Sequence, residues 1–125
     1  MSTRPQGGGS DRGQSTVEVA LAMPLLCVLL LAVVQVAIVV RDQLLVVDAA
    51  RVAARAAAVA TDPAAAAATA GARAGPPGSR VATSVDGDLV TVRVMAVSPT
   101  DVPLIGALLP DVTLDATATM LLDPP

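Results

Sequence analysis

VALAMPLLCVLLLAVVQVAIVV, residues Val19 to Val40, is an almost unbroken run of apolar side chains, called here the apolar span. A helix of roughly 20 apolar residues crosses the hydrocarbon core of a bilayer. Gln35 is its one polar interruption and Pro24 its one helix disruptor, and a membrane helix tolerates both. A buried core helix is the first alternative, but so small a chain could not bury this run. A cleaved signal peptide is the second, although its apolar core is usually shorter, roughly 7–15 residues. The span therefore predicts a transmembrane helix.

The same helix is predicted to continue beyond the membrane. At about 100° per residue, the charged residues between positions 41 and 62, apart from Asp42, fall within a wedge of roughly 80°. The remaining surface is mostly alanine and valine, which suits close packing. We expect Arg51 and Arg55 to lie in a solvated stripe, with Asp48 pairing with Arg51 across one turn.

A break is predicted at Asp62-Pro63, because the residue before a proline resists helical geometry. Residues 64–74 are then expected to form one or two further helical turns. The glycines and prolines of residues 75–79 indicate a linker.

After the linker, the apolar period changes to two, which is typical of strands. We predict strands at Arg80–Val85, Leu89–Val97 and Val112–Leu122, with Asp86-Gly87-Asp88 as the turn of a hairpin. One face of the sheet would carry Val90, Val92, Val94, Ala96, Val112, Leu114, Ala116 and Ala118. The loop at residues 99–110 has apolar side chains that would cover the sheet, namely Leu104, Ile105, Leu108 and Leu109.

The fold class that follows is α+β: one long N-terminal helix, transmembrane and then amphipathic, and a small antiparallel sheet of about three strands packed on its alanine-rich half. The predicted organisation is a leader at 1–13, a membrane span at 14–40, an amphipathic helical region at 41–74, a linker at 75–79 and a β domain at 80–125.

The composition argues against catalysis. The chain has no His, Lys or aromatic residue and only one Glu, and its single cysteine, Cys27, lies inside the apolar span. No nucleophile–base pair and no metal-ligand cluster emerges, so we expect no enzyme, no metal, no cofactor and no small-molecule substrate. The last third is acidic, whereas nucleic acid requires a clustered basic face. No nucleic-acid partner is therefore expected.

The segment RGQSTVEV, residues 12–19, is the most informative for function. A polar, glycine-rich leader, predicted to be disordered, ends at Gly13. If a protease cut there, Gln14 would become a positively charged N-terminus about one helical turn from the Glu18 carboxylate. In an array of such helices, this carboxylate could neutralise the new amine of a neighbour and fix the register. Alternatively, Glu18 is only an N-terminal helix residue favoured by the helix dipole.

Gly13 followed by QSTVEV resembles the processing site of type IV prepilins, and the chain is similar to the TadE-like pseudopilins of tight-adherence (Tad) pilus systems. The segment DAARVAAR, residues 48–55, is similar to the alanine- and arginine-rich stretch of that family, and ATATMLL near the C-terminus to its last strand. Val19 stands where the family commonly has an aromatic residue.

The resemblance implies cleavage after Gly13 by a prepilin peptidase, and a role for Glu18 in assembly. It implies a minor pilin, because the major pilins of this system are little more than the helix. The expected partners are the membrane, the peptidase, other Tad pilins, inner-membrane platform proteins and an assembly ATPase. The N-terminus would be cytoplasmic and the β domain extracytoplasmic, in or at the base of a surface filament. The alternative is an uncleaved single-pass anchor that displays a small interaction domain.

Overall fold

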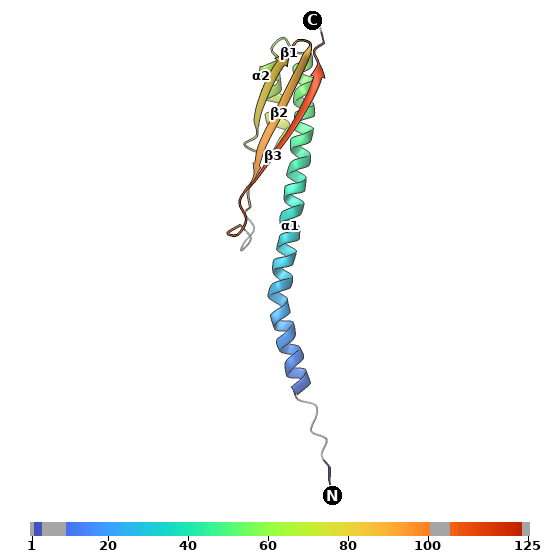
Figure 1. The fold of residues 1–125 in the computed structure, drawn as a ribbon, viewed down its shortest axis with the longest axis vertical. Coiled ribbons are helices and arrows are strands. Elements are labelled where there is room, and N and C mark those ends of the chain that lie inside the picture. Colours follow the sequence, from blue (N-terminus) through green and yellow to red (C-terminus); the bar gives the residue numbers. More distant parts are fainter. Residues whose placement is uncertain (1, 4–9, 101–105, 124–125) are drawn as a thin grey trace.

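The computed structural model describes residues 2–3, 10–100 and 106–123, and its longest element is the helix α1, Ser10–Ala58. At 1.5 Å per residue, these 49 residues form a rod of about 74 Å. Figure 1 shows the other elements gathered against the C-terminal half of this rod. Pro24 lies inside α1 without ending it. The prediction of one helix running through and beyond the apolar span is confirmed.

The N-terminal half of α1 is uncovered by the rest of the described chain. Every residue from Asp11 to Leu30 is exposed, although most are large and apolar. The core helix of a water-soluble protein would be covered, so the core-helix alternative is wrong. In the described residues, α1 is the one helix long and apolar enough to cross a membrane. It fits a membrane anchor.

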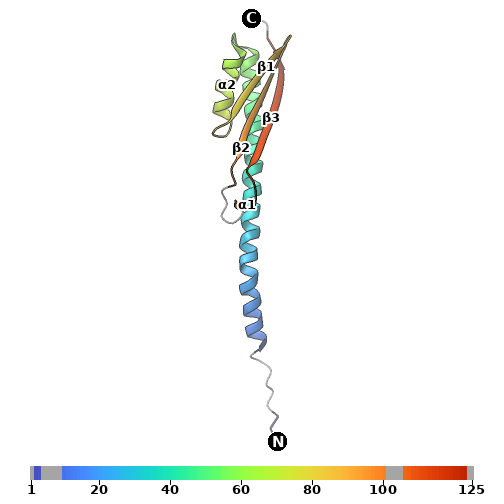
Figure 2. The same ribbon diagram turned by 60° about the vertical axis from the view of Figure 1, so that its left-hand side comes forward.

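The C-terminal half of α1 packs through small side chains. It contacts β2 and β3 on one side and α2 on another (Figure 2). Alanines let the helix backbone approach the valines of the sheet closely, which makes a thin core possible without aromatic residues. The predicted packing face is confirmed. The core residues are Val46, Ala49, Ala50, Ala53, Ala54, Ala57, Ala58, Ala67, Val90, Val92, Val94, Ala96 and Leu114. We call α2, the sheet and residues 46–58 of α1 the head.

The predicted break before Pro63 is confirmed. α1 ends at Ala58, and a short turn leads into α2, Pro63–Ala74. Asp62 caps this second helix, since its Oδ1 accepts a hydrogen bond of 3.1 Å from the backbone N–H of Ala65. Proline suits the first helical position because its missing N–H has no partner there. At 12 residues, α2 is longer than the one or two turns expected.

Three antiparallel strands follow in the order β1-β2-β3: β1 is Arg80–Asp86, β2 is Leu89–Ser98 and β3 is Val112–Leu121. Gly87, in the turn between β1 and β2, has φ of +59°, a left-handed conformation that favours glycine. The predicted strands and turn are confirmed, to within one residue at each strand end. These elements complete the expected α+β fold.

The predicted alternation of faces is confirmed for β2, whose apolar residues on the α1 side are buried. In β3, Leu114 is buried and Ala116 and Ala118 are half-buried against the core. Val112 is exposed, contrary to expectation. It lies at the end of the sheet nearest the apolar span, beyond the small residues of α1.

The loop between β2 and β3 does not cover the sheet with its described leucines. Leu108 and Leu109 are both exposed. Figures 1 and 2 show the loop's described segment before β3, residues 106–111, extending past the end of the sheet, beside the middle of α1. Leu104 and Ile105 lie outside the described residues. The sequence showed an apolar loop but not the direction in which it leaves the sheet.

Two local expectations are also wrong. α1 begins at Ser10, so residues 10–13 are helical rather than disordered; residues 1 and 4–9 of the leader lie outside the described residues. Asp11 in the first turn interacts favourably with the helix dipole.

Asp48, Arg51 and Arg55 are exposed as a solvated stripe, but within the described ranges no ion pair joins Asp48 to Arg51. Such exposed pairs contribute little, which leaves both side chains free to remain hydrated.

A glycine in α2 gives a test of the core. A Cβ at Gly71 would lie 2.7 Å from Cγ2 of Val81 and 3.3 Å from Cβ of Ala53, so there is no room for a side chain. Gly71→Leu is expected to lower the free energy of unfolding of the head by about 1–3 kcal/mol or more, because overpacking displaces α2 from β1. Hydrogen exchange of the β1 and β2 amides in detergent micelles measures this opening. Ala72→Leu, at the next and exposed position, is the control and should change exchange little.

Candidate processing and assembly site

The three residues predicted to matter for function lie together on the first turns of α1. Gly13, Gln14 and Glu18 are all exposed, and they precede the apolar span without interruption. Gln14 and Glu18 are four residues apart, which places them on one face of the helix, about 6 Å apart along its axis. The predicted spacing between a new amine at Gln14 and the Glu18 carboxylate is therefore available in this helix.

Gly13 has no structural reason to be glycine among the described residues. A Cβ built there meets nothing within 4 Å, and its backbone is not in the left-handed region. Glycine inside a helix costs about 0.5–1 kcal/mol relative to alanine. The helix disfavours glycine at this position, and packing does not require it. The glycine therefore indicates a requirement that comes from outside this fold.

Glu18 likewise has no partner within the described chain. The one ion pair found in the described ranges joins Arg93 to Asp115, far from Glu18. The nearby hydroxyls of Ser15 and Thr16 donate to the backbone carbonyls of Asp11 and Arg12, each at 2.9 Å, rather than to the carboxylate. The Glu18 carboxylate is therefore free to pair with another molecule.

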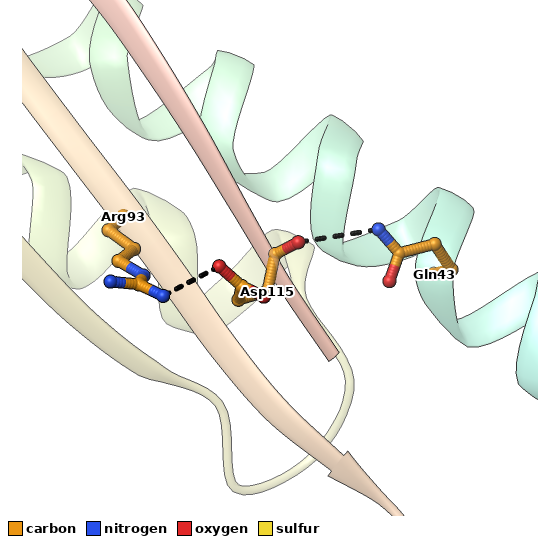
Figure 3. A network of polar contacts seen from close by, with 3 residues as sticks. All are labelled: Gln43, Arg93 and Asp115. Carbon is orange, nitrogen blue, oxygen red and sulfur yellow. Dashed lines mark hydrogen bonds and ion pairs between the residues drawn. The ribbon is translucent and has the colours of Figure 1, made fainter. Parts of the chain in front are cut away.

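Sequence reasoning missed the contacts that attach the head to α1. Figure 3 shows Asp115 of β3 between two partners: its Oδ2 accepts a hydrogen bond of 2.8 Å from Nη2 of Arg93, and its backbone O accepts one of 3.3 Å from Nε2 of Gln43. The Ser98 hydroxyl donates to Oδ2 of Asp42 at 2.8 Å. Asp42 is the charged residue of this part of α1 that falls outside the wedge of charged side chains. Its separate position on the helix was the sequence signal that could have indicated a contact of its own.

The described residues show no arrangement suited to catalysis or metal binding. No group of three or more potential ligands comes together among them. A hollow of about 1180 Å³ lies at the end of the head farthest from the apolar span. Its ionisable residues are Arg55, Asp88 and Asp123, which supply no nucleophile and base pair.

Comparison with protein families assigns the N-terminal part of the chain. Residues 13–55 match the sequence model of the family described as TadE-like protein. The match begins at Gly13 and ends at Arg55, so it includes the apolar span and the alanine-rich half of α1. The match covers about a third of the chain and supports its resemblance to the TadE-like family. The resemblance seen in the sequence is confirmed.

The TadE-like family comprises structural and assembly components of Tad pili and is not a family of enzymes. The match at residues 13–55 therefore indicates association with the membrane and with Tad pilus components. The part of the chain that follows residue 55, including α2 and the sheet, lies outside the match. Comparisons with curated proteins and with solved structures returned no match.

Proposed function

We propose that this TadE-like protein is a minor pilin, or pseudopilin, which a prepilin peptidase cleaves after Gly13 before it joins a Tad-type pilus or a related secretion machine. The observation that carries the proposal is the isolated pair on α1: an unrequired glycine at Gly13 and an unpartnered carboxylate at Glu18, immediately before the apolar span. Recognition by other proteins would account for both residues.

In this proposal, residues 14–40 lie in the membrane, and residues 41–74 and the β domain at 80–125 lie outside the cytoplasm. The leader at 1–13 remains cytoplasmic until it is removed. The partners are the peptidase, the inner-membrane platform, the assembly ATPase and the other pilins of the system. The head distinguishes this chain from a subunit consisting of little more than a helix.

One observation favours an uncleaved anchor as the second candidate. α1 runs without a break through Gly13, so the peptide bond to be cut lies within a helix. A protease needs this segment unwound. The first turns of a helix open at low cost, which makes such unwinding compatible with cleavage.

The intact mass of the protein purified from membranes of its native host tests the proposal. We expect a mass that lacks Met1 to Gly13. The full-length mass would establish the uncleaved anchor, and Glu18 would lose its proposed role. Loss of the entire apolar span would show a secreted protein and would contradict both candidates.

A further inference from the structure

The position of the head along α1 relates it to the bilayer surface. As a helix, the apolar span is about 32 Å long, close to the roughly 30 Å of a hydrocarbon core. Arg41 and Asp42 mark its end. Residues 35–40 therefore occupy the last two turns within the membrane, and a segment beside them lies in or at the adjoining leaflet.

The loop between β2 and β3 reaches this level. Leu109 and Val112 border a hollow of about 520 Å³ whose other side is formed by Gln35, Val39 and Val40 of α1. In both views the segment that leads into β3, residues 106–111, lies beyond the end of the sheet, at the height of the middle of α1 (Figures 1 and 2). The loop is therefore at the depth of the last turns of the apolar span.

The described part of this loop is apolar and exposed. Leu108 is 82% exposed and Leu109 is 53% exposed. The sequence from Val102 to Pro110 carries no charge. Neighbouring exposed leucines of this kind indicate a surface that a membrane or another protein covers.

The base of the loop is closed by hydrogen bonds. The Thr100 backbone N–H donates to Oδ1 of Asp111 at 3.0 Å, and its hydroxyl donates to the backbone O of Pro110 at 3.2 Å. These bonds occupy the carboxylate that follows the apolar residues. They also join Thr100 to the residues that follow Leu108 and Leu109 in the chain.

Gln35 points to what fills the hollow. Its side chain is only 6% exposed, and neither amide atom has a hydrogen-bond partner among the described residues. An unpaired amide in an apolar site is costly. Gln35 lies about 9 Å below Arg41 along the helix, so water that enters the hollow from the ester region of the lipids can pair with it, and the rest of the hollow is apolar enough for an acyl chain.

We propose that residues 106–110, the described part of the loop between β2 and β3, form a second membrane contact, in which Leu108 and Leu109 insert into the adjoining leaflet and a lipid chain occupies the hollow beside Gln35. The inference rests on membrane insertion of α1, which is part of the proposed function, but not on cleavage at Gly13 or on which side the head lies. Two contacts, one helix and one loop, would hold the head in one orientation on the bilayer.

Depth-dependent fluorescence quenching tests this contact. The full chain with Cys27→Ala and Leu108→Cys is labelled with an environment-sensitive dye and reconstituted in phosphatidylcholine–phosphatidylglycerol vesicles. We expect a blue-shifted emission and strong quenching by lipids brominated near the carbonyl end of their chains, since interfacial segments lie about 5–10 Å into the headgroup and acyl boundary. Val59→Cys, which is similarly exposed at 73% but lies at the far end of the head, should remain unquenched.

A third label separates failure of this inference from failure of membrane insertion. Leu30→Cys, which lies inside the apolar span, must be quenched by brominated lipids if α1 spans the bilayer. Quenching at position 30 without quenching at 108 would overturn the loop contact alone. A blue shift at 108 that does not respond to bromination would show that protein, such as a second copy, covers the loop, and would also overturn it. Absence of quenching at both positions would contradict the membrane proposal itself.

Discussion

Gly13→Leu is expected to abolish removal of the leader and to leave the full-length protein in the membrane. The fold itself should accept leucine, because a Cβ at position 13 meets nothing within 4 Å. The apolar span is unchanged, so insertion should be unaffected. A protease that recognises glycine at the cleavage site, however, has no space for a side chain at that position, so leucine should prevent cleavage. Intact mass and membrane fractionation give the two readouts.

The variant also strengthens the helix through the cut site, by about 1 kcal/mol, because glycine is a poor helix former. Gly13→Ala separates the two effects. Alanine is the best helix former but adds only one methyl group. If stiffening of the helix blocked cleavage, alanine would block it as strongly as leucine; if the size of the side chain matters, alanine should retain more cleavage. Ala20→Leu, exposed two turns further along α1, controls for added bulk and should be cleaved normally. Normal cleavage of Gly13→Leu would place the cut elsewhere.

Local patterns were sufficient to predict the elements of this fold. The apolar span and the alanine face fixed α1 because both repeat with helical period over many residues. The alternation Val90, Val92, Val94 and the Asp86-Gly87-Asp88 turn predicted the hairpin, since a strand buried on one face leaves this signature. The resemblance to the TadE-like family, too, could be predicted from the residues around Gly13 and Glu18.

What the sequence did not reveal depends on contacts between distant residues. Asp42 and Ser98 lie 56 positions apart, and Gln43 and Asp115 lie 72 apart, so no local pattern joins them. Gln35 was visible only as a polar interruption of the apolar span. Its burial beside the loop depends on how the head sits along α1. The direction of the loop between β2 and β3 was unpredictable for the same reason.

The processing and assembly residues differ from these packing contacts. Gly13 and Glu18 are recognisable in the sequence because their roles depend on other proteins rather than on the rest of the chain. Both residues are exposed on the first turns of α1, where other proteins can reach them.

Glu18→Ala is expected to leave folding, membrane insertion and cleavage intact while nearly abolishing incorporation into the pilus. In the assembled state, the amine of Gln14 from a neighbouring subunit would lie in a water-poor helix bundle, and without Glu18 it would have no counter-charge. Leaving one member of a buried ion pair uncompensated typically costs several kcal/mol, so incorporation should fall by about a hundredfold or more. Quantifying the subunit in sheared pilus fractions and in membranes of the same cells measures the loss.

Two further variants determine whether charge is responsible. Glu18→Gln keeps the shape and the hydrogen-bonding capacity of the side chain but removes the charge, so it should assemble nearly as poorly as alanine. Asp48→Ala removes another exposed acid from the same helix, beyond the apolar span, and should assemble normally. Normal assembly of Glu18→Ala would reduce Glu18 to an ordinary N-terminal helix residue and would favour the anchor over the minor pilin. Loss of assembly in Glu18→Ala but not in Glu18→Gln would instead indicate that hydrogen bonding, rather than charge, sets the register between subunits.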